Sequence, residues 1–487
     1  MKRRHWVRLD NASNIFPAAR SDADPKVFRL GAELDHEVDP VLLQEALEET
    51  FERFPLYHAV LRRGVFWYYL QDSDLQPQVV AETEQICAPI YQADRRTLLF
   101  RVLHHRRRVG LEVFHALSDG TGALWFLTDL LGAYTRRRFP GEAPADAPEA
   151  ESVRPGARER PDPPRTEIGA HPGAEAAEEV HELTTDSFAH YFRRRRRAPS
   201  SHEQDFTREA APAVLTVQEA AREEGPTDED RAPRPERPRR RVHRLRGTRT
   251  PDNRPRALEL TMPAAPVLGL AKAEGVAPTM YLTALFFEAI RRADPRAHGP
   301  STLAASVPVN LRQFFPSTSA RNFFATIRVE HTYGHGDDSV GAVARGLQEA
   351  FGAEATPEAL ARRLHRLIRV ERWPLARVVP RPLKDLLLNL INVANNRSLT
   401  VAVSNLGRIT LPAPAQSHVG RMLFHVSAVR PQFCAITHDG KLVLGFTSPY
   451  VETAHVREYA RLLTGAGIEV SLAAARTTEE ELAGVDG

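Results

Sequence analysis

A long segment without apolar patterning divides this chain of 487 residues into two halves. Residues 140–240 hold 14 of the 37 prolines, with dense arginine, glutamate, aspartate and alanine and few large apolar residues. Such a segment cannot bury enough surface to offset the entropy lost when a chain becomes ordered. We therefore expect a disordered insertion between two folded domains.

The first half, residues 1–139, alternates between strand and helix patterns. Residues 26–34 alternate apolar and polar side chains, which predicts a strand, and apolar residues at helical spacing follow it. Strand patterns on either side of short turns predict two hairpins, at 59–70 and 97–115. A helical pattern resumes after Gly120. We expect an antiparallel or mixed sheet with helices packed on it.

The second half, residues 241–475, shows the same alternation and ends in a short tail, 476–487. Regular structure resumes at 242–248, and strands are predicted at 257–260, 303–309, 323–331 and 399–404, with a hairpin over 433–446. Helices are predicted at 264–273, 279–291, 339–351, 357–369 and 454–464. The predicted fold class is α/β, with two sandwich domains separated by the insertion.

Composition excludes several classes of protein. A formal net charge of +3 is slight for this length, so we expect no nucleic-acid partner. Cys87 and Cys434 lie far apart in the chain, which excludes a disulfide framework and a thiolate metal site. No segment has the apolar length of a membrane span or the apolar core of a secretion signal. We expect a cytoplasmic monomer.

One short motif carries the chemistry. His115 closes a predicted strand, and Asp119 and Gly120 follow it just before a helix, in the string HALSDG. Transfer of an acyl group from a thioester to a hydroxyl or amine needs a base and a site for the oxyanion, because the thiolate leaves readily. A positioned histidine contributes roughly 10² to 10⁴ in rate, since its pKa lies near the working pH.

The same residues have a structural interpretation. His115 can be a histidine at the end of a strand, and Ser118 or Asp119 can simply cap the helix that follows, because both residue types are favoured at that position. A six-residue string is a hypothesis until its context is known.

The context of the motif resembles a known family over nearly the whole chain outside the insertion. The sequence is similar to the chloramphenicol acetyltransferase-like superfamily, which includes condensation domains, BAHD acyltransferases, wax ester synthases and alcohol acetyltransferases, and it most resembles the last group. Four places carry the resemblance: residues 9–17 (LDNASNIFP), 114–120 (FHALSDG), 308–312 (PVNLR) with 321–324 (RNFF), and 403–407 (VSNLG).

The resemblance implies two similar domains with a channel between them and His115 at its middle. It assigns His115 as the general base and Asp119 as a structural carboxylate, held by an arginine of the second half for which Arg312 is the candidate. It also implies that Asn405 and Gly407 lie near the channel. No bound cofactor is expected. The co-substrate would be an acyl-CoA or a phosphopantetheine thioester, with a small-molecule acceptor, and an acyl carrier protein is a further candidate partner.

The motif departs from the family pattern at one position. Phe114 stands where condensation domains carry a first histidine, which favours a free-standing acyltransferase over a condensation enzyme. The alternative is an inactive member that serves as a scaffold or docks carrier proteins. Retention of both His115 and Asp119 counts against that alternative.

Other motifs are weaker. His104 and His105 lack a following Asp-Gly pair, and His331 and His335 flank a Tyr-Gly pair that is typical of a loop, so no metal site is assigned. The arginine run at 193–197 follows three aromatic residues and could bind phosphates or an anionic membrane. We interpret it as a solvated charge run within the insertion.

Overall fold

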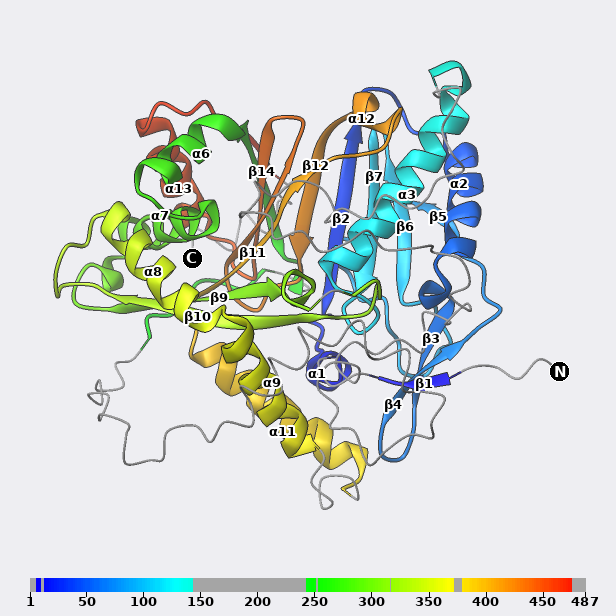
Figure 1. Cartoon of the computed structure of the whole chain (residues 1–487), viewed down its shortest axis with the longest axis horizontal. Helices are drawn as coiled ribbons and strands as arrows, with labels where there is room; N and C mark the ends of the chain where they lie inside the picture. Colours follow the sequence, from blue (N-terminus) through cyan, green and yellow to red (C-terminus); the bar gives the residue numbers. More distant parts are fainter. Residues whose placement is uncertain are drawn as a thin grey trace, which may run out of the picture.

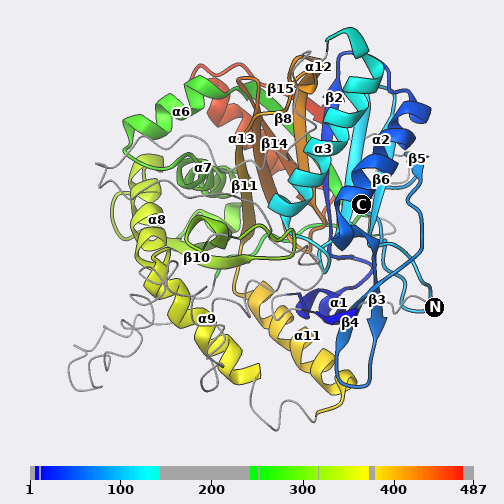
Figure 2. The same ribbon diagram turned by 45° about the vertical axis from the view of Figure 1, so that its right-hand side comes forward.

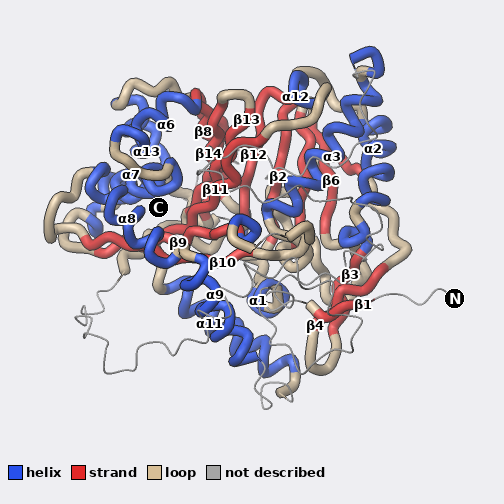
Figure 3. Tube along the Cα trace, viewed as in Figure 1, coloured by secondary structure: helices blue, strands red, loops and turns tan. Residues whose placement is uncertain are grey.

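The computed structural model describes residues 6–9, 13–142, 242–250, 253–315, 317–371 and 379–474. The predicted insertion beyond residue 142, with its arginine run, and the tail at 476–487 lie outside the described residues. The described chain is a mixed α/β structure built around two large sheets that lie side by side (Figures 1 and 3). This is the predicted fold class.

The first sheet has five strands. In spatial order they are β12 (Val419–Val426), β2 (Val27–Leu34), β7 (Arg108–Phe114), β6 (Phe100–His105) and β5 (Val79–Ala81). Helices α2 (Pro40–Arg53) and α3 (Gly120–Arg138) pack against each other, and α3 packs on β2 and β7. The Asp39 carboxylate accepts hydrogen bonds from the backbone N–H groups of Val41 and Leu42, which caps α2 at its first turn.

The second sheet has seven strands. In spatial order they are β10 (Phe324–Thr332), β9 (Thr302–Asn310), β11 (Val401–Ile409), β13 (Gln432–His438), β14 (Lys441–Ser448), β8 (Arg256–Pro263) and β15 (Ser471–Ala474). Helices around it are α6 (Ala264–Ala273), α7 (Pro278–Ala293), α8 (Val340–Glu354), α9 (Pro357–Glu371) and α13 (Ala454–Gly465). Phe286 of α7 contacts Phe433 and Phe446 edge-on, which seats this helix over β13 and β14.

The two sheets are tied together by a strand that crosses between the halves of the chain. β12 belongs to the second half by sequence, yet it pairs antiparallel with β2 in the first sheet. The sheets approach closely here, because a Cβ on Gly445 of β14 would overlap the Phe424 carbonyl of β12. Ion pairs from Arg108 and Arg421 of the first sheet to Glu259 of β8 join the same regions. The proposed boundary at residue 241 therefore does not separate the two sheets.

A third, small sheet and two helices flank the large sheets. The sheet has the order β1 (Trp6–Arg8), β4 (Tyr68–Asp72) and β3 (Ala59–Arg63). Helix α1 (Ile15–Ala19) packs against α11 (Arg381–Arg397), and both lie below the large sheets in Figure 1. The short helix α12 (Ala415–His418) leads into β12.

Most predicted elements are found close to their expected positions. The strand at 26–34, both hairpins of the first half and the helix after Gly120 are present. At 242–250 the structure has only isolated bridges, at Val242 and Arg249, so the expected regular structure is absent there. Helix α11 and strand β12 were not predicted. Among the described helices, none combines the length and apolar character needed to traverse a lipid bilayer.

Candidate functional site

His115 lies directly after β7, where the chain turns toward α3. Its backbone N–H donates a hydrogen bond to the carbonyl of Lys26, at 2.8 Å, which continues the pairing of β7 with β2 by one residue. The preceding residue, Phe114, is fully buried and stacks on Tyr91. The Phe114 side chain, at the position where condensation domains carry a first histidine, therefore points into the core.

Asn322 forms hydrogen bonds with both the backbone carbonyl and the imidazole ring of His115. Its side-chain nitrogen donates to the backbone carbonyl of His115 and to the hydroxyl of Ser13, each at 2.7 Å. Because these two acceptors fix the orientation of the amide, its oxygen faces the imidazole Nδ1, 3.2 Å away. An amide oxygen only accepts, so Nδ1 carries the proton. The lone pair of the ring is then on Nε2, which has no hydrogen-bond partner among the described residues.

Aromatic rings surround the imidazole. Phe16 of α1 stacks on it with ring centroids 4.2 Å apart, Phe28 approaches edge-on at 5.0 Å, and Phe324 lies at 5.5 Å. The His115 side chain is half-buried. This burial lowers the pKa of His115 below the ordinary imidazole value of about 6.5, because an apolar environment disfavours the charged ring.

Asp119 positions the loop that carries Asn322. One carboxylate oxygen accepts from the backbone N–H of Gly122 at 2.9 Å, which makes Asp119 the N-cap of α3. The other oxygen accepts from the backbone N–H of Phe323 at 2.8 Å and from the Arg312 guanidinium at 2.7 Å. Both side chains of the ion pair are at most 7% exposed. Asp119 is thus a positioning residue, because its described hydrogen bonds go to the backbone N–H groups of Gly122 and Phe323 and to the Arg312 guanidinium.

Arg312 extends the same network across the second half. Its guanidinium also donates to the carbonyls of Ser319 and Arg321, which fixes the segment just before Asn322. The structure therefore links Asp119 and Arg312 to His115 through the segment 321–323: they bind the backbone of Phe323 and Arg321, and Asn322 between them binds His115. The sequence did not assign a role to Asn322. In the sequence, residues 321–324 (RNFF) belong only to the family resemblance.

Gly120 and Gly122 allow close contacts at the start of α3. A Cβ on Gly120 would meet the Leu406 side chain at 3.1 Å. At Gly122 a Cβ would overlap the Ala320 carbonyl and the Ser118 hydroxyl, two groups that are themselves hydrogen-bonded at 2.6 Å. Gly122 is a second residue whose role was missed, because a glycine in a helix has no distinctive sequence pattern.

Replacing Gly122 by alanine should destabilise the protein by about 1 to 3 kcal/mol, because the added methyl group must displace the backbone carbonyl of Ala320. The free energy of unfolding in urea measures this loss. Gly346→Ala is the matched control, because a Cβ there meets nothing within 4 Å and alanine favours the helix. A Gly122→Ala variant as stable as Gly346→Ala would contradict the steric argument.

Asn405 and Gly407 lie at a bulge in β11. The Asn405 amide donates to the Thr279 hydroxyl at 2.9 Å, and its oxygen accepts from the Gly407 backbone N–H at 2.8 Å. Gly407 has a φ of +75°, a conformation that favours glycine. The Asn405 side chain is engaged in shaping this turn. The turn reaches the site through Leu406, which contacts Gly120 at the start of α3.

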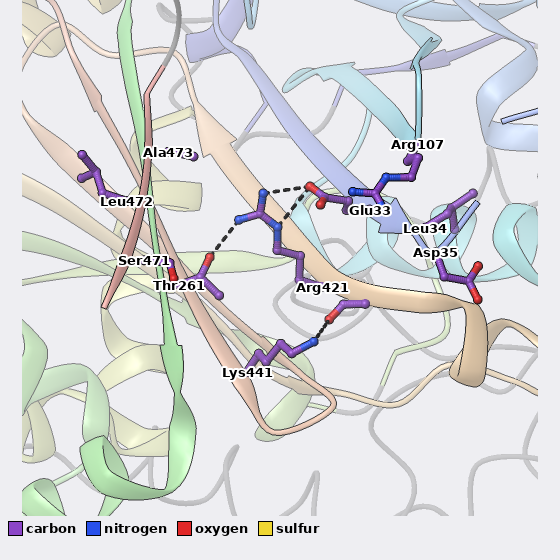
Figure 4. A pocket seen from close by; sticks show the side chains of 11 residues that line it. Glu33, Leu34, Asp35, Arg107, Thr261, Arg421, Lys441, Ser471, Leu472 and Ala473 are labelled. Carbon is purple, nitrogen blue, oxygen red and sulfur yellow. Dashed lines mark hydrogen bonds and ion pairs between the residues drawn. The ribbon is translucent and has the colours of Figure 1, made fainter. Parts of the chain in front are cut away.

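A cavity of about 440 Å³ lies at the far ends of β2 and β7, away from His115 (Figure 4). Its lining includes Glu33, Arg107, Arg421 and Lys441, and Arg421 is bonded to both Glu33 and Thr261. Seven strand residues separate this end of β7 from His115, a span on the order of 20 Å. None of the residues that contact His115 lines this cavity.

Among the described residues, one group could offer ligands to a metal ion: Asp35, His36 and His418. Asp35 accepts from both imidazoles, at 2.6 and 3.0 Å. The remaining ring nitrogens are hydrogen-bonded to Tyr134 and Glu142. Hydrogen bonds and charge therefore account for this arrangement.

Comparison with known proteins identifies the fold. No family model matches the sequence, and no curated protein matches it. The structure is similar to the trichothecene 15-O-acetyltransferase TRI3 from Fusarium sporotrichioides, with a TM-score of 0.57, 9% identity and 95% of each chain covered. It is also similar to TRI101 from F. sporotrichioides, solved with coenzyme A and T-2, with a TM-score of 0.55, 9% identity and 96% and 99% covered.

A third similar structure is the first condensation domain of the calcium-dependent antibiotic synthetase, with a TM-score of 0.53, 14% identity and 94% and 96% covered. At these identities the similarity establishes the fold alone. The chain therefore shares its fold with these acetyltransferases and with this condensation domain.

Proposed function

We propose that this chain is an acyltransferase in which His115 acts as general base for transfer of an acyl group from a thioester to a hydroxyl or amine. The observation that carries the proposal is the pair of hydrogen bonds between Asn322 and His115. Asn322 holds the Nδ1 proton and leaves Nε2 with a lone pair, and the ring is half-buried. A neutral, oriented imidazole is the form that general-base catalysis needs.

The proposed reaction uses Nε2 twice. It first takes the proton of the acceptor hydroxyl or amine as that atom attacks the thioester carbonyl. The tetrahedral intermediate then collapses, the carbon–sulfur bond breaks, and Nε2 returns the proton to the departing thiolate. Asp119 and Arg312 act through Asn322, because they fix the segment that carries it. The ring walls of Phe16 and Phe28 keep the imidazole neutral before reaction.

The thioester donor would be an acyl-CoA or a phosphopantetheine thioester. Support comes from the fold, since one similar structure contains coenzyme A and another is a condensation domain. The acceptor would be a small molecule with a hydroxyl or amine group. Incubation with mixed acyl-CoAs and candidate acceptors, followed by mass spectrometry of the products, tests the proposal directly. Absence of any His115-dependent product with CoA or carrier-protein donors would favour an inactive scaffold.

The pH profile should reflect the lowered pKa of His115. Only the neutral imidazole can accept a proton, so the rate falls as the pH drops through the pKa of the folded protein. Because that pKa lies below the ordinary value of about 6.5, the midpoint of the decline in kcat/KM should lie below pH 6.5. Circular dichroism at each pH separates this decline from acid unfolding. A midpoint at or above 6.5 in a folded protein would contradict the assignment.

A further inference from the structure

Helix α11 turns its apolar face to solvent. Leu383, Leu386, Leu387, Leu390 and Ile391, the α11 apolar face, are each between 42% and 58% exposed. Their spacing of three and four residues places them on a single stripe of the helix. Single exposed apolar residues are ordinary on protein surfaces, but a contiguous stripe indicates a surface that binds something.

Polar contacts anchor α11 to the protein. Asp385 accepts from the Tyr68 hydroxyl at 2.8 Å, and the Lys384 ammonium lies 3.6 Å from the centre of the Trp67 ring. The Arg381 backbone N–H donates to the Val65 carbonyl at 2.9 Å. At the other end, Asn396 accepts from Arg430 at 2.5 Å. These contacts fix the rotation of the helix, so the leucines face outward in a defined orientation.

The tip of the β3–β4 hairpin extends the apolar surface. Val65 and Phe66 are exposed, and they lie next to α11, because the carbonyls of both residues accept hydrogen bonds from it. Figure 2 shows α11 beside α1 and the hairpin at one end of the molecule.

The charges of this region favour an anionic partner. Across residues 62–69 and 381–397 there are five basic side chains and one acidic side chain, Asp385, which is engaged by Tyr68. An apolar helical face flanked by cations is the arrangement that binds anionic lipid surfaces, since the apolar groups enter the interface and the cations meet the headgroups.

We propose that the α11 apolar face and the tip of the β3–β4 hairpin bind the surface of an anionic lipid bilayer. This differs from the expectation drawn from the sequence, in which only the arginine run at 193–197 suggested a membrane. Helix α11 would lie in the interface, because its polar face contacts the protein.

The location of this surface has a consequence for the reaction. Helix α1 packs against α11, and Phe16 of α1 stacks on His115. Helix α1 therefore contacts both the proposed lipid-binding helix and the imidazole. The next step rests on the proposed function. Membrane binding through α11 brings the site to a place where a substrate dissolved in the bilayer, such as a long-chain acyl donor or a lipid alcohol, can reach it.

Sedimentation of the full chain with vesicles tests the proposal. The protein should sediment with vesicles of phosphatidylcholine and phosphatidylglycerol, bind less to pure phosphatidylcholine, and be partly released by salt. Leu387→Glu/Leu390→Glu should reduce the partition coefficient roughly 100-fold, because two leucines no longer enter the interface. Leu268→Glu/Leu472→Glu is the matched control, since both residues are exposed leucines on other elements, α6 and β15.

Three results would overturn the proposal. The wild type could stay in the supernatant, or the two double variants could lose binding equally. Finally, the wild type could bind no vesicles and form a dimer in the absence of lipid, with Leu387→Glu/Leu390→Glu a monomer. The last result would assign the face to contact with a second copy. The His115→Ala variant should bind vesicles as the wild type does. Failure of membrane binding and failure of acyl transfer are therefore separate observations.

Discussion

The His115→Ala variant should transfer acyl groups at a rate about 10² to 10⁴ lower than the wild type, because it lacks the base that takes the proton of the acceptor. The loss should fall mainly on kcat. KM should change little, since the alanine removes a group that acts in the transition state. The test compares the rates at which the wild type and His115→Ala form products from mixed acyl-CoAs. The enzyme is used at concentrations far above those of any contaminating acyltransferase.

Two controls separate a catalytic effect from a structural one. His105→Ala removes an exposed histidine at the end of β6 and should leave the rate unchanged. His115→Phe keeps an aromatic ring against Phe16 and Phe28 but cannot accept a proton, so it should be as inactive as His115→Ala and closer to the wild type in stability. Equal rates for the wild type and His115→Ala would remove the assignment of the base.

Breaking the ion pair of Arg312 with Asp119 should have the largest effect on stability. Each of Arg312→Ala and Asp119→Ala should lower the free energy of unfolding by about 3 to 5 kcal/mol, because each leaves the partner charge buried and unpaired. The double variant should lose less than the sum of the two, which a double-mutant cycle in urea would measure. Both single variants should also lose activity, since the segment that carries Asn322 is held by this pair.

The exposed pair of Arg328 with Glu330 provides the control, since its side chains are 45% and 49% exposed. Removing either partner there should change stability by less than about 1 kcal/mol. If Arg312→Ala were as mild as Arg328→Ala, the buried pair would not hold the site. If Arg312→Ala kept full activity in a folded protein, the link from Arg312 to Asn322 would be wrong.

The sequence was informative where a local pattern determines local structure. The hairpin over 97–115 and the helix after Gly120 follow from periodicity and turn residues, and together they place His115 at a strand end and Asp119 at a helix N-cap. The pairing with Arg312 was suggested by family resemblance. No pattern within either half specifies a contact between residues 193 positions apart.

Three features could not be predicted, for separate physical reasons. Asn322 acts through three hydrogen bonds to distant residues, and an asparagine in a loop usually forms a turn. Helix α11 is amphipathic, but which face of an amphipathic helix meets the protein depends on its neighbours. Strand β12 was not predicted, and nothing local in the sequence indicates that its partner would be β2, almost 400 residues earlier in the chain.

The crossing of β12 bears on how the protein is made. Strand β2 leaves the ribosome early, whereas the segment that covers its edge is translated only near residue 419. At ordinary elongation rates, the interval is on the order of tens of seconds. During that time the first sheet has an open edge at β2, which is a template for association with other chains. Newly made protein should therefore depend on chaperones until the C-terminal part of the chain emerges and closes the sheet.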